Sequence, residues 1–119
     1  MELTTTTLKI RGKLFGGIKS IMDDPGMRAV FEDHIPWLRE RAQIHQVNKH
    51  DAHRFNYDLH AYLAQNNVDY SMHWLIMRMN GYQYQWDFHE YVEFLLVPSN
   101  QDVNELIDQY AATRNIIVR

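Results

Sequence analysis

Four histidines between residues 45 and 60 form the densest set of side chains in this sequence that could bind a metal ion: His45, His50, His53 and His60. The spacing His50-x-x-His53 would place two imidazoles on one face of a helix, where they could hold zinc or nickel. The pattern does not predict a helix there and shows no third ligand beside the pair. The alternative is that these histidines lie at the surface or at an interface. We therefore predict neither a bound metal nor a cofactor.

Two other places carry side chains suited to acid–base catalysis. His73 precedes Trp74, and His89 precedes Glu90, so either histidine could act in proton transfer. Single histidines in aromatic surroundings, however, more often form hydrogen bonds within a packed structure. Neither place is accompanied by a nucleophile motif, a glycine-rich phosphate loop or a pair of carboxylates. The sequence therefore predicts that the protein is not an enzyme.

The segment that follows Asn80-Gly81 is rich in aromatic side chains that alternate with polar ones. Flat amphipathic rings of this kind anchor partner proteins and also stack on sugars. Three interpretations stay open: a contact with a partner, coverage of the core, or a ligand groove. We favour the partner contact. The candidate partner-binding residues, which include two apolar residues of the N-terminal segment, are Leu8, Ile10, Tyr82, Tyr84, Trp86, Phe88 and Tyr91.

Composition limits the classes of protein to which this chain can belong. Its 119 residues are enough for one domain, or for one small domain with an arm. A 45% apolar and 13% aromatic content suits a packed core and argues against global disorder. The net charge is −3, with basic and acidic residues interspersed, so no basic field predicts binding to nucleic acid or to an anionic membrane.

Cysteine usage and the N-terminal residues indicate the compartment. The chain has no cysteine, which excludes disulfides and thiolate metal sites and fits a reducing compartment. The start, MELTTTTLKIRGKLF, lacks the basic and apolar regions of a signal peptide, and no apolar run approaches the ~20 residues of a membrane span. We expect a soluble, unprocessed chain.

The first 47 residues are typical of an arm followed by helices. Residues 3–11 form a threonine-rich run in which apolar and polar side chains alternate, a pattern that favours an edge strand or an extended arm. Asp24-Pro25 is typical of a helix start. Pro36 should end or kink that helix near His34, and residues 37–47 should continue as a second helical piece that carries Trp37, Leu38 and Ile44.

The second half has a more distinctive order of signals. Asp58 and Asp69 are each placed to cap a helix, and Asn80-Gly81 is typical of the end of the second one, since glycine readily adopts the left-handed conformation needed there. A strand is predicted at residues 93–99, stopped by Pro98, and a final amphipathic helix at residues 102–112. The order of extended segment, helix, helix, loop, strand and helix predicts a small α+β fold.

This order resembles the LysM-like domain, a strand–helix–helix–strand (βααβ) fold. In LysM-like domains an aspartate opens the first helix, Asn-Gly ends the second, and an apolar strand ends in proline. With an Asp-Phe pair in the loop, the chain is most similar to the LysM-like wedge component of contractile phage tail baseplates. The residues that carry the resemblance are Arg54, Tyr57-Asp58-Leu59, Tyr62-Leu63, Trp74, Asn80-Gly81, Asp87-Phe88 and Leu95-Leu96-Val97-Pro98-Ser99.

The resemblance implies a structural protein of the virion, assembled in the host cytoplasm as part of the tail baseplate. Its partners would be other baseplate or tail subunits, and contacts between copies of the chain are compatible with that role. The N-terminal strand would add to a neighbour's sheet edge, and the loop at residues 82–91 would act as a hydrophobic anchor. The implied organisation is an arm with helices in residues 1–47 and a LysM-like domain with a C-terminal helix in residues 48–119.

The alternative is a carbohydrate-binding LysM module that recognises peptidoglycan. Two features depart from the cell-wall members of that family. The turn Tyr57-Asp58-Leu59 contains no glycine, and the loop from Tyr82 to Glu93 is long and aromatic. A protein-binding use of the fold tolerates both changes, because such a use requires surfaces and not a glycan groove.

Overall fold

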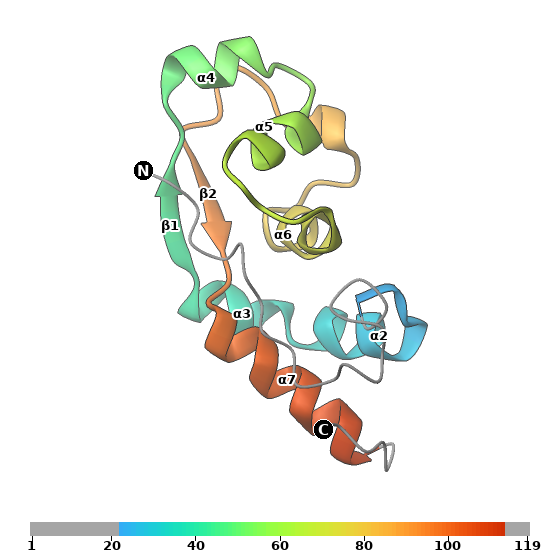
Figure 1. The fold of residues 1–119 in the computed structure, drawn as a ribbon. Helices are drawn as coiled ribbons and strands as arrows, with labels where there is room; N and C mark the ends of the chain where they lie inside the picture. The colour runs from blue at the N-terminus through green and yellow to red at the C-terminus, as the bar shows by residue number, and fades with distance from the viewer. Residues whose placement is uncertain (1–21, 114–119) are drawn as a thin grey trace.

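The computed structural model describes residues 22–113 and shows a mixed α+β fold (Figure 1). Within this part of the chain there are six α-helices and a two-stranded antiparallel sheet. The predicted arm, with Leu8 and Ile10, lies outside the described residues. The elements are α2 (Pro25–Asp33), α3 (Ile35–Arg41), β1 (Gln43–Gln46), α4 (Lys49–Arg54), α5 (Leu59–Gln65), the 3-10 turn η2 (Tyr70–Met72), α6 (His73–Met79), the 3-10 turn η3 (Gln85–Asp87), β2 (Phe94–Val97) and α7 (Asn100–Thr113).

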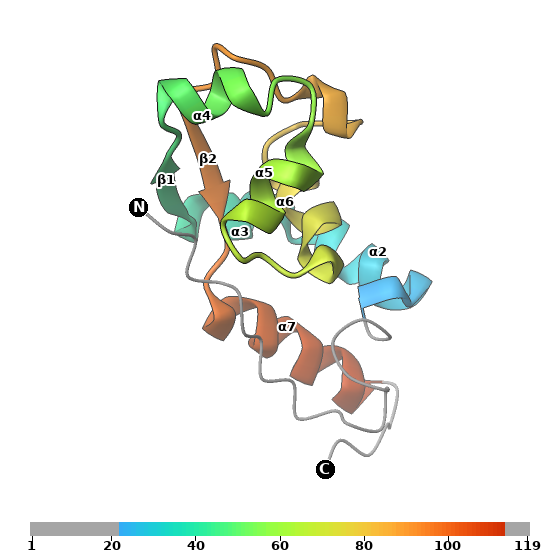
Figure 2. The same cartoon turned by 45° about the horizontal axis from the view of Figure 1, so that its top comes forward.

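The sheet joins two segments that are far apart in the sequence. β1 pairs with β2 from Gln43↔Val97 to Gln46↔Phe94, and α4, α5 and α6 lie between them in the chain. In Figure 1, α5 and α6 lie on one side of the strands, and α2, α3 and α7 gather at the end opposite α4. The view in Figure 2 shows the same separation, with α7 beyond the strands. The fold is thus a strand, a group of helices and a strand, extended at one end by three helices.

The prediction that residues 43–46 continue a helix is wrong. α3 ends at Arg41, and Ala42 is extended, with φ −67° and ψ 152°. The pairing partner of β1 lies some fifty residues later, so a local pattern could not show that these residues form a strand. From Ile44 to Val47 burial alternates as in a half-buried strand: Ile44 is 62% exposed and His45 only 3%.

Several helix boundaries follow the local signals. Asp24 accepts a hydrogen bond from the amide of Met27, and Asp58 accepts one from Ala61, so both are N-caps as predicted. The break at Pro36 is confirmed, with α2 ending at Asp33. α4 was not predicted. Its cap is Asn48, whose side chain accepts from the amides of His50 and Asp51.

The predicted capping role of Asp69 is wrong: its side chain forms no cap hydrogen bond, and α6 begins at His73, after the 3-10 turn η2. The end of α6 matches the prediction. The helix ends at Met79, and Gly81 has φ +73°, a conformation that glycine adopts without steric cost. The carboxamide of Asn80 then joins the helix to the sheet. It donates to the carbonyls of Ile76 (2.7 Å) and Leu96 (2.9 Å) and accepts from the amide of Leu96 (2.8 Å). At Leu96 this side chain takes the place of a neighbouring strand.

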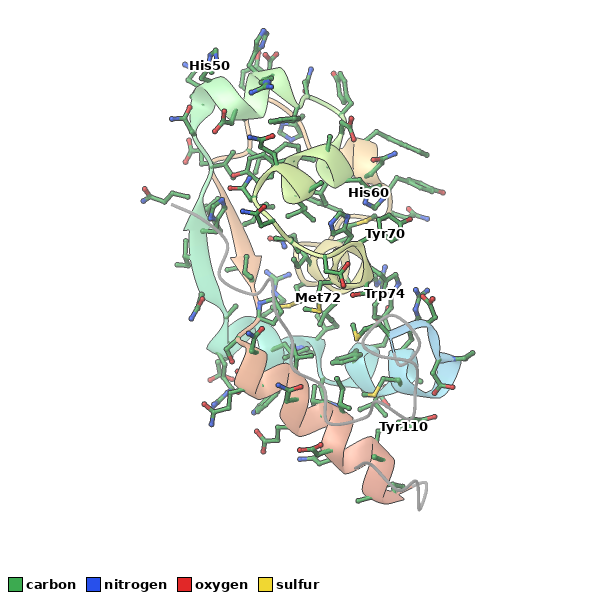
Figure 3. The ribbon with its side chains drawn as sticks, viewed as in Figure 1. His50, His60, Tyr70, Met72, Trp74 and Tyr110 are labelled. Carbon is green, nitrogen blue, oxygen red and sulfur yellow. The ribbon has the colours of Figure 1, made fainter. Side chains whose placement is uncertain are left out.

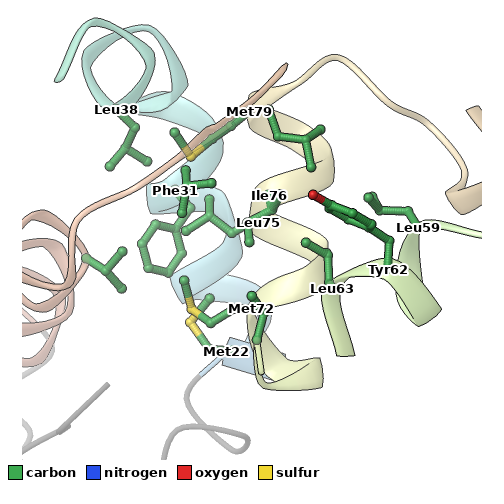
Figure 4. Packing of buried hydrophobic residues seen from close by; sticks show 14 of the residues in the cluster. Met22, Phe31, Leu38, Leu59, Tyr62, Leu63, Met72, Leu75, Ile76 and Met79 are labelled. Atoms are coloured by element: carbon green, nitrogen blue, oxygen red, sulfur yellow. The ribbon is translucent and has the colours of Figure 1, made fainter. Parts of the chain in front are cut away.

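One hydrophobic core runs through the described residues, and part of it is shown in Figure 4. The predicted inward face of the last helix is confirmed: Val103, Leu106, Ile107 and Tyr110 are buried. The Tyr110 hydroxyl donates to the Asp24 carboxylate, which joins α7 to the cap of α2. The domain boundary at residue 47 stays a prediction. The described residues on its two sides share this core and the sheet.

Asn80 offers a direct test of how α6 is held against β2. Asn80→Ala removes all three hydrogen bonds and leaves the half-buried amide and carbonyl of Leu96 without this partner. It should lower the free energy of unfolding by about 3 kcal/mol, measured by denaturant titration. The matched control is Asn66→Ala, which removes one hydrogen bond to Tyr62 and should cost about 1 kcal/mol. Equal losses in the two variants would contradict the bridging role of Asn80.

Candidate interaction surface

One carboxylate closes the turn within the loop between α6 and β2. Asp87 Oδ2 accepts hydrogen bonds from the backbone amides of Gln83 (2.9 Å) and Tyr84 (3.0 Å), and this closes the turn around η3 (Gln85–Asp87). A charged acceptor makes such bonds stronger than neutral ones. The rings that the turn carries are therefore presented on a defined backbone.

Tyr84 and Trp86 form a stacked pair on this turn. Their ring centroids are 4.6 Å apart, and the ring planes differ by 9°. Tyr84 is 45% exposed and Trp86 55% exposed. Both predicted anchors therefore lie at the surface, next to each other, with their orientation set before any partner arrives.

The prediction that Phe88 contacts a partner is wrong. Phe88 is 0% exposed and stacks on Tyr62 of α5, with ring centroids 5.1 Å apart. Its carbonyl also accepts from the amide of Tyr57 (2.8 Å). The polar–aromatic alternation continues through Phe88, but η3 turns the backbone before it. Phe88 therefore points inward, unlike Tyr84 and Trp86, and anchors the loop to the core.

The other two aromatic residues of the loop, Tyr82 and Tyr91, differ in exposure. Tyr82 is half-buried, and burial raises the pKa of its hydroxyl. Tyr91 is 76% exposed and lies beside His89, with ring centroids 6.1 Å apart. Tyr91 is therefore available at the surface, and Tyr82 only in part. Leu8 and Ile10 lie outside the described residues.

The outer face of the sheet carries apolar side chains that sequence reasoning missed. Ile44 is 62% exposed and Phe94 51% exposed. Ile44 pairs with Leu96 and Gln46 with Phe94, so these four side chains share one face, opposite to buried His45. The helical prediction for these residues did not reveal this face, because side chains share a face about every 3.6 residues in a helix and every second residue in a strand.

The histidines divide between surface and interior. His50 and His53 lie on α4, both exposed, and His53 Nδ1 is 2.8 Å from the Glu90 carboxylate. Glu90 thus pairs with His53, not with its neighbour His89 as the acid–base hypothesis required. In the described part of the chain, no three histidine, aspartate or glutamate side chains gather in a way that could hold a metal ion.

His45, His60 and His73 are buried or half-buried and make specific contacts, and half-buried His34 contacts the Val30 carbonyl through Nδ1 (2.7 Å). His45 Nε2 is 2.6 Å from the Tyr62 hydroxyl, and the nitrogens His60 Nδ1 and His73 Nδ1 are 2.8 Å apart. Burial lowers the pKa of His45, of His60 and of His73 below the ordinary value of 6.5. These imidazoles are therefore neutral at physiological pH.

The burial of these histidines predicts a loss of stability in mild acid. Because the folded-state pKa values are lowered, the unfolded chain binds more protons once the pH falls below about 6.5. Stability is fully present above that pH and should fall between pH 6.5 and 5, as measured by denaturant unfolding at each pH. His45→Gln should reduce this dependence, and the exposed control His50→Gln should leave it intact. A free energy of unfolding that stays constant between pH 6.5 and 5 would contradict the lowered pKa values of the buried histidines.

Trp86 and Phe88 provide a matched pair of aromatic substitutions in one loop. Phe88→Ala should lower the free energy of unfolding by about 3 to 5 kcal/mol, because it removes a fully buried ring. Trp86→Ala should cost about 1 kcal/mol or less, the value of an exposed stacking contact. Thermal and denaturant unfolding of both variants measures the difference. A similar cost for the two would mean that Trp86 belongs to the core.

Comparison with known proteins adds no assignment: no family model, curated protein or solved structure matches the chain. Across residues 22–113, none of the helices has the length and apolar character needed to cross a membrane. The surface feature of the described residues that suits binding is the stacked, half-exposed pair of Tyr84 and Trp86.

Proposed function

We propose that this chain is a LysM-like structural component of a contractile phage tail baseplate, where it joins neighbouring subunits through protein–protein contacts. The order of β1, helices and β2 supports the LysM-like part of the proposal. The observation that carries the adhesive role is the stacked, half-exposed pair of Tyr84 and Trp86 on a turn closed by Asp87.

A rigid aromatic pair suits adhesion because ordering side chains on binding costs conformational entropy. Rings that are already stacked lose little conformational freedom when a partner covers them. Tyrosine and tryptophan are also the residues that dominate interface energies. Exposed Tyr91 follows in the same loop and lines a surface hollow with Lys49 and His50 of α4, where it offers a further aromatic contact.

The sheet supplies a second means of attachment. Val47 donates to the Glu93 carbonyl, so, by the alternation of an antiparallel ladder, the backbone groups of Ile44 and Gln46 point to the outer edge of β1. Among the described residues, no third strand pairs with that edge. We propose that it accepts an extended segment from a neighbouring subunit, and that the chain's own threonine-rich residues 3–11 add to a sheet edge in the same manner.

The alternative, a peptidoglycan-binding module, receives less support from the aromatic pair. A sugar ring binds by covering a free aromatic face. In the Tyr84–Trp86 stack each ring already covers one face of the other, which leaves two outward faces that point in opposite directions. Sedimentation with purified peptidoglycan distinguishes the two functions: the adhesive role expects the chain to stay in the supernatant, and a pelleted fraction would favour the glycan module.

Localisation tests the proposal directly. Particles of the phage that encodes this chain should contain it, and immunogold labelling should place it at the baseplate end of the tail. In particles assembled with Trp86→Ala, incorporation should fall as expected for a loss of about 2 kcal/mol of binding free energy, roughly thirtyfold in affinity. The control Gln83→Ala, in the same loop, should incorporate normally. Particles that lack the protein, or that assemble equally well with Trp86→Ala, would overturn the proposed role.

A further inference from the structure

A pocket of about 270 Å³ lies where α2, α5 and the start of α6 meet, apart from the aromatic loop. Its walls include His60, Tyr70, Trp74 and Met77. In Figure 3, His60, Tyr70 and Trp74 follow one another along one side of the molecule. An apolar cavity of about 150 Å³ is enough to hold benzene, and drug-sized ligands use about 300 Å³ or more. The pocket therefore has the size for a single ring.

Hydrogen bonding determines which histidine nitrogen carries a proton. His73 Nε2 is 3.0 Å from the carbonyl oxygen of Val68, and a carbonyl oxygen only accepts, so Nε2 carries the hydrogen. His73 Nδ1 is then an acceptor in the neutral ring. His60 Nδ1, 2.8 Å away, must be the donor. It follows that His60 Nε2 keeps a free lone pair on the ring that lines the pocket.

The histidine pair is held as a rigid unit. The two ring planes differ by 16°, and their centroids are 5.0 Å apart. With the facing nitrogens 2.8 Å apart, this separation places the rings end to end, nearly in one plane, joined by a direct N–H···N bond. The Tyr70 ring packs against both, 5.1 Å from His60 and 5.2 Å from His73. The direction of the free lone pair is therefore set in advance.

The charges beside the pocket offset each other. The Arg28 guanidinium lies 4.8 Å from the centre of the Trp74 ring, donates to the Met22 carbonyl (2.9 Å) and pairs with Asp23 (3.2 Å). Neither an anion nor a cation is favoured by a site with one fixed charge of each sign. Asp23 is engaged by Arg28, and the Ser71 hydroxyl donates to Asp69. The neutral imidazole of His60 then offers an acceptor beside the apolar and aromatic faces of the pocket. A neutral ring with one hydroxyl donor matches that combination.

We propose that this pocket binds a neutral phenol ring, whose hydroxyl donates to His60 Nε2 while the ring packs against Trp74 and Met77. Two sources share this chemistry: a tyrosine side chain of another protein and a free phenolic compound. The inference is independent of the baseplate role, because the pocket does not include the Tyr84–Trp86 pair or the sheet edge.

Three small probes test the proposal by NMR titration of the wild-type chain at pH 7.5. Phenol and N-acetyltyrosinamide should shift the Trp74 indole and His60 imidazole signals, and N-acetylphenylalaninamide, which lacks only the hydroxyl, should bind at least about tenfold more weakly. Binding of phenol but not of N-acetyltyrosinamide would support the pocket and assign it to free phenolics. If both amides bind with equal affinity, or if none of the three probes binds, the proposal is overturned.

A pair of variants tests whether His60 Nε2 is the acceptor that binds the phenol hydroxyl. His60→Phe keeps an aromatic ring but removes the lone pair, so phenol binding should be lost. His50→Phe, a change on the exposed face of α4, should bind phenol like the wild type. Two-bond ¹H–¹⁵N spectra of the unmodified chain provide a test that needs no variant: they should show His60 protonated at Nδ1. A His60 protonated at Nε2 would overturn the assignment.

The acceptor role also predicts how binding depends on pH. Burial lowers the pKa of both histidines, and the carboxylates of Asp58, near His60, and Asp69, near His73, act in the opposite direction. Asp23 and Arg28, on the facing wall, offset each other. Once His60 is protonated, Nε2 donates and no longer accepts. Phenol affinity should therefore fall between pH 7.5 and pH 5, and an affinity unchanged over that range would contradict the proposal.

Discussion

The carboxamide of Asn80 is the constraint on which much of this structure depends. It binds the last turn of α6 and both backbone groups of Leu96 at once, so the position of the helix and the position of β2 are set together. A carboxamide suits this place because it presents one donor group and one acceptor in the spacing of a peptide unit. β2 in turn positions β1, whose other edge stays open among the described residues.

The aromatic loop between α6 and β2 is positioned at both ends by the hydrogen bonds of Asn80. It leaves α6 at Gly81 and returns to the sheet at Phe94, and between these points two devices hold it. Buried Phe88 ties the loop to Tyr62 in the core, and Asp87 closes the turn beside it. Because the loop is tied down from the inside, Tyr84 and Trp86 are exposed on a backbone whose course is set by the core. A surface of this kind is suited to holding a partner and does not require turnover.

The histidines show how environment, and not residue type, decides a role. His50 and His53 lie in water on α4, and His53 pairs with a carboxylate. His45, His60 and His73 are removed from water to different degrees, and each contacts a polar group inside the molecule. Loss of hydration makes the neutral form the stable one. In the neutral form an imidazole has one donor and one acceptor, so a single backbone carbonyl, that of Val68, can order the hydrogen bonds of two rings.

The sequence alone determined the features that rest on local physics. The caps at Asp24 and Asp58, the break at Pro36, the helix end at Asn80-Gly81 and the strand before Pro98 all follow from backbone geometry and hydrogen bonding within a few residues. The inward face of α7 follows from its helical period. The small α+β fold was therefore within reach of sequence reasoning.

Only the tertiary structure decided which residues meet across long separations. β1 is a strand because Phe94–Val97 pairs with it, Phe88 is buried because Tyr62 offers it a face, and His60 acts with His73 because α5 and α6 pack together. A sequence pattern reports the period of one element and the chemistry of its ends. It carries no direct signal of which distant element will cover a given face, because that choice depends on the packing of the whole core.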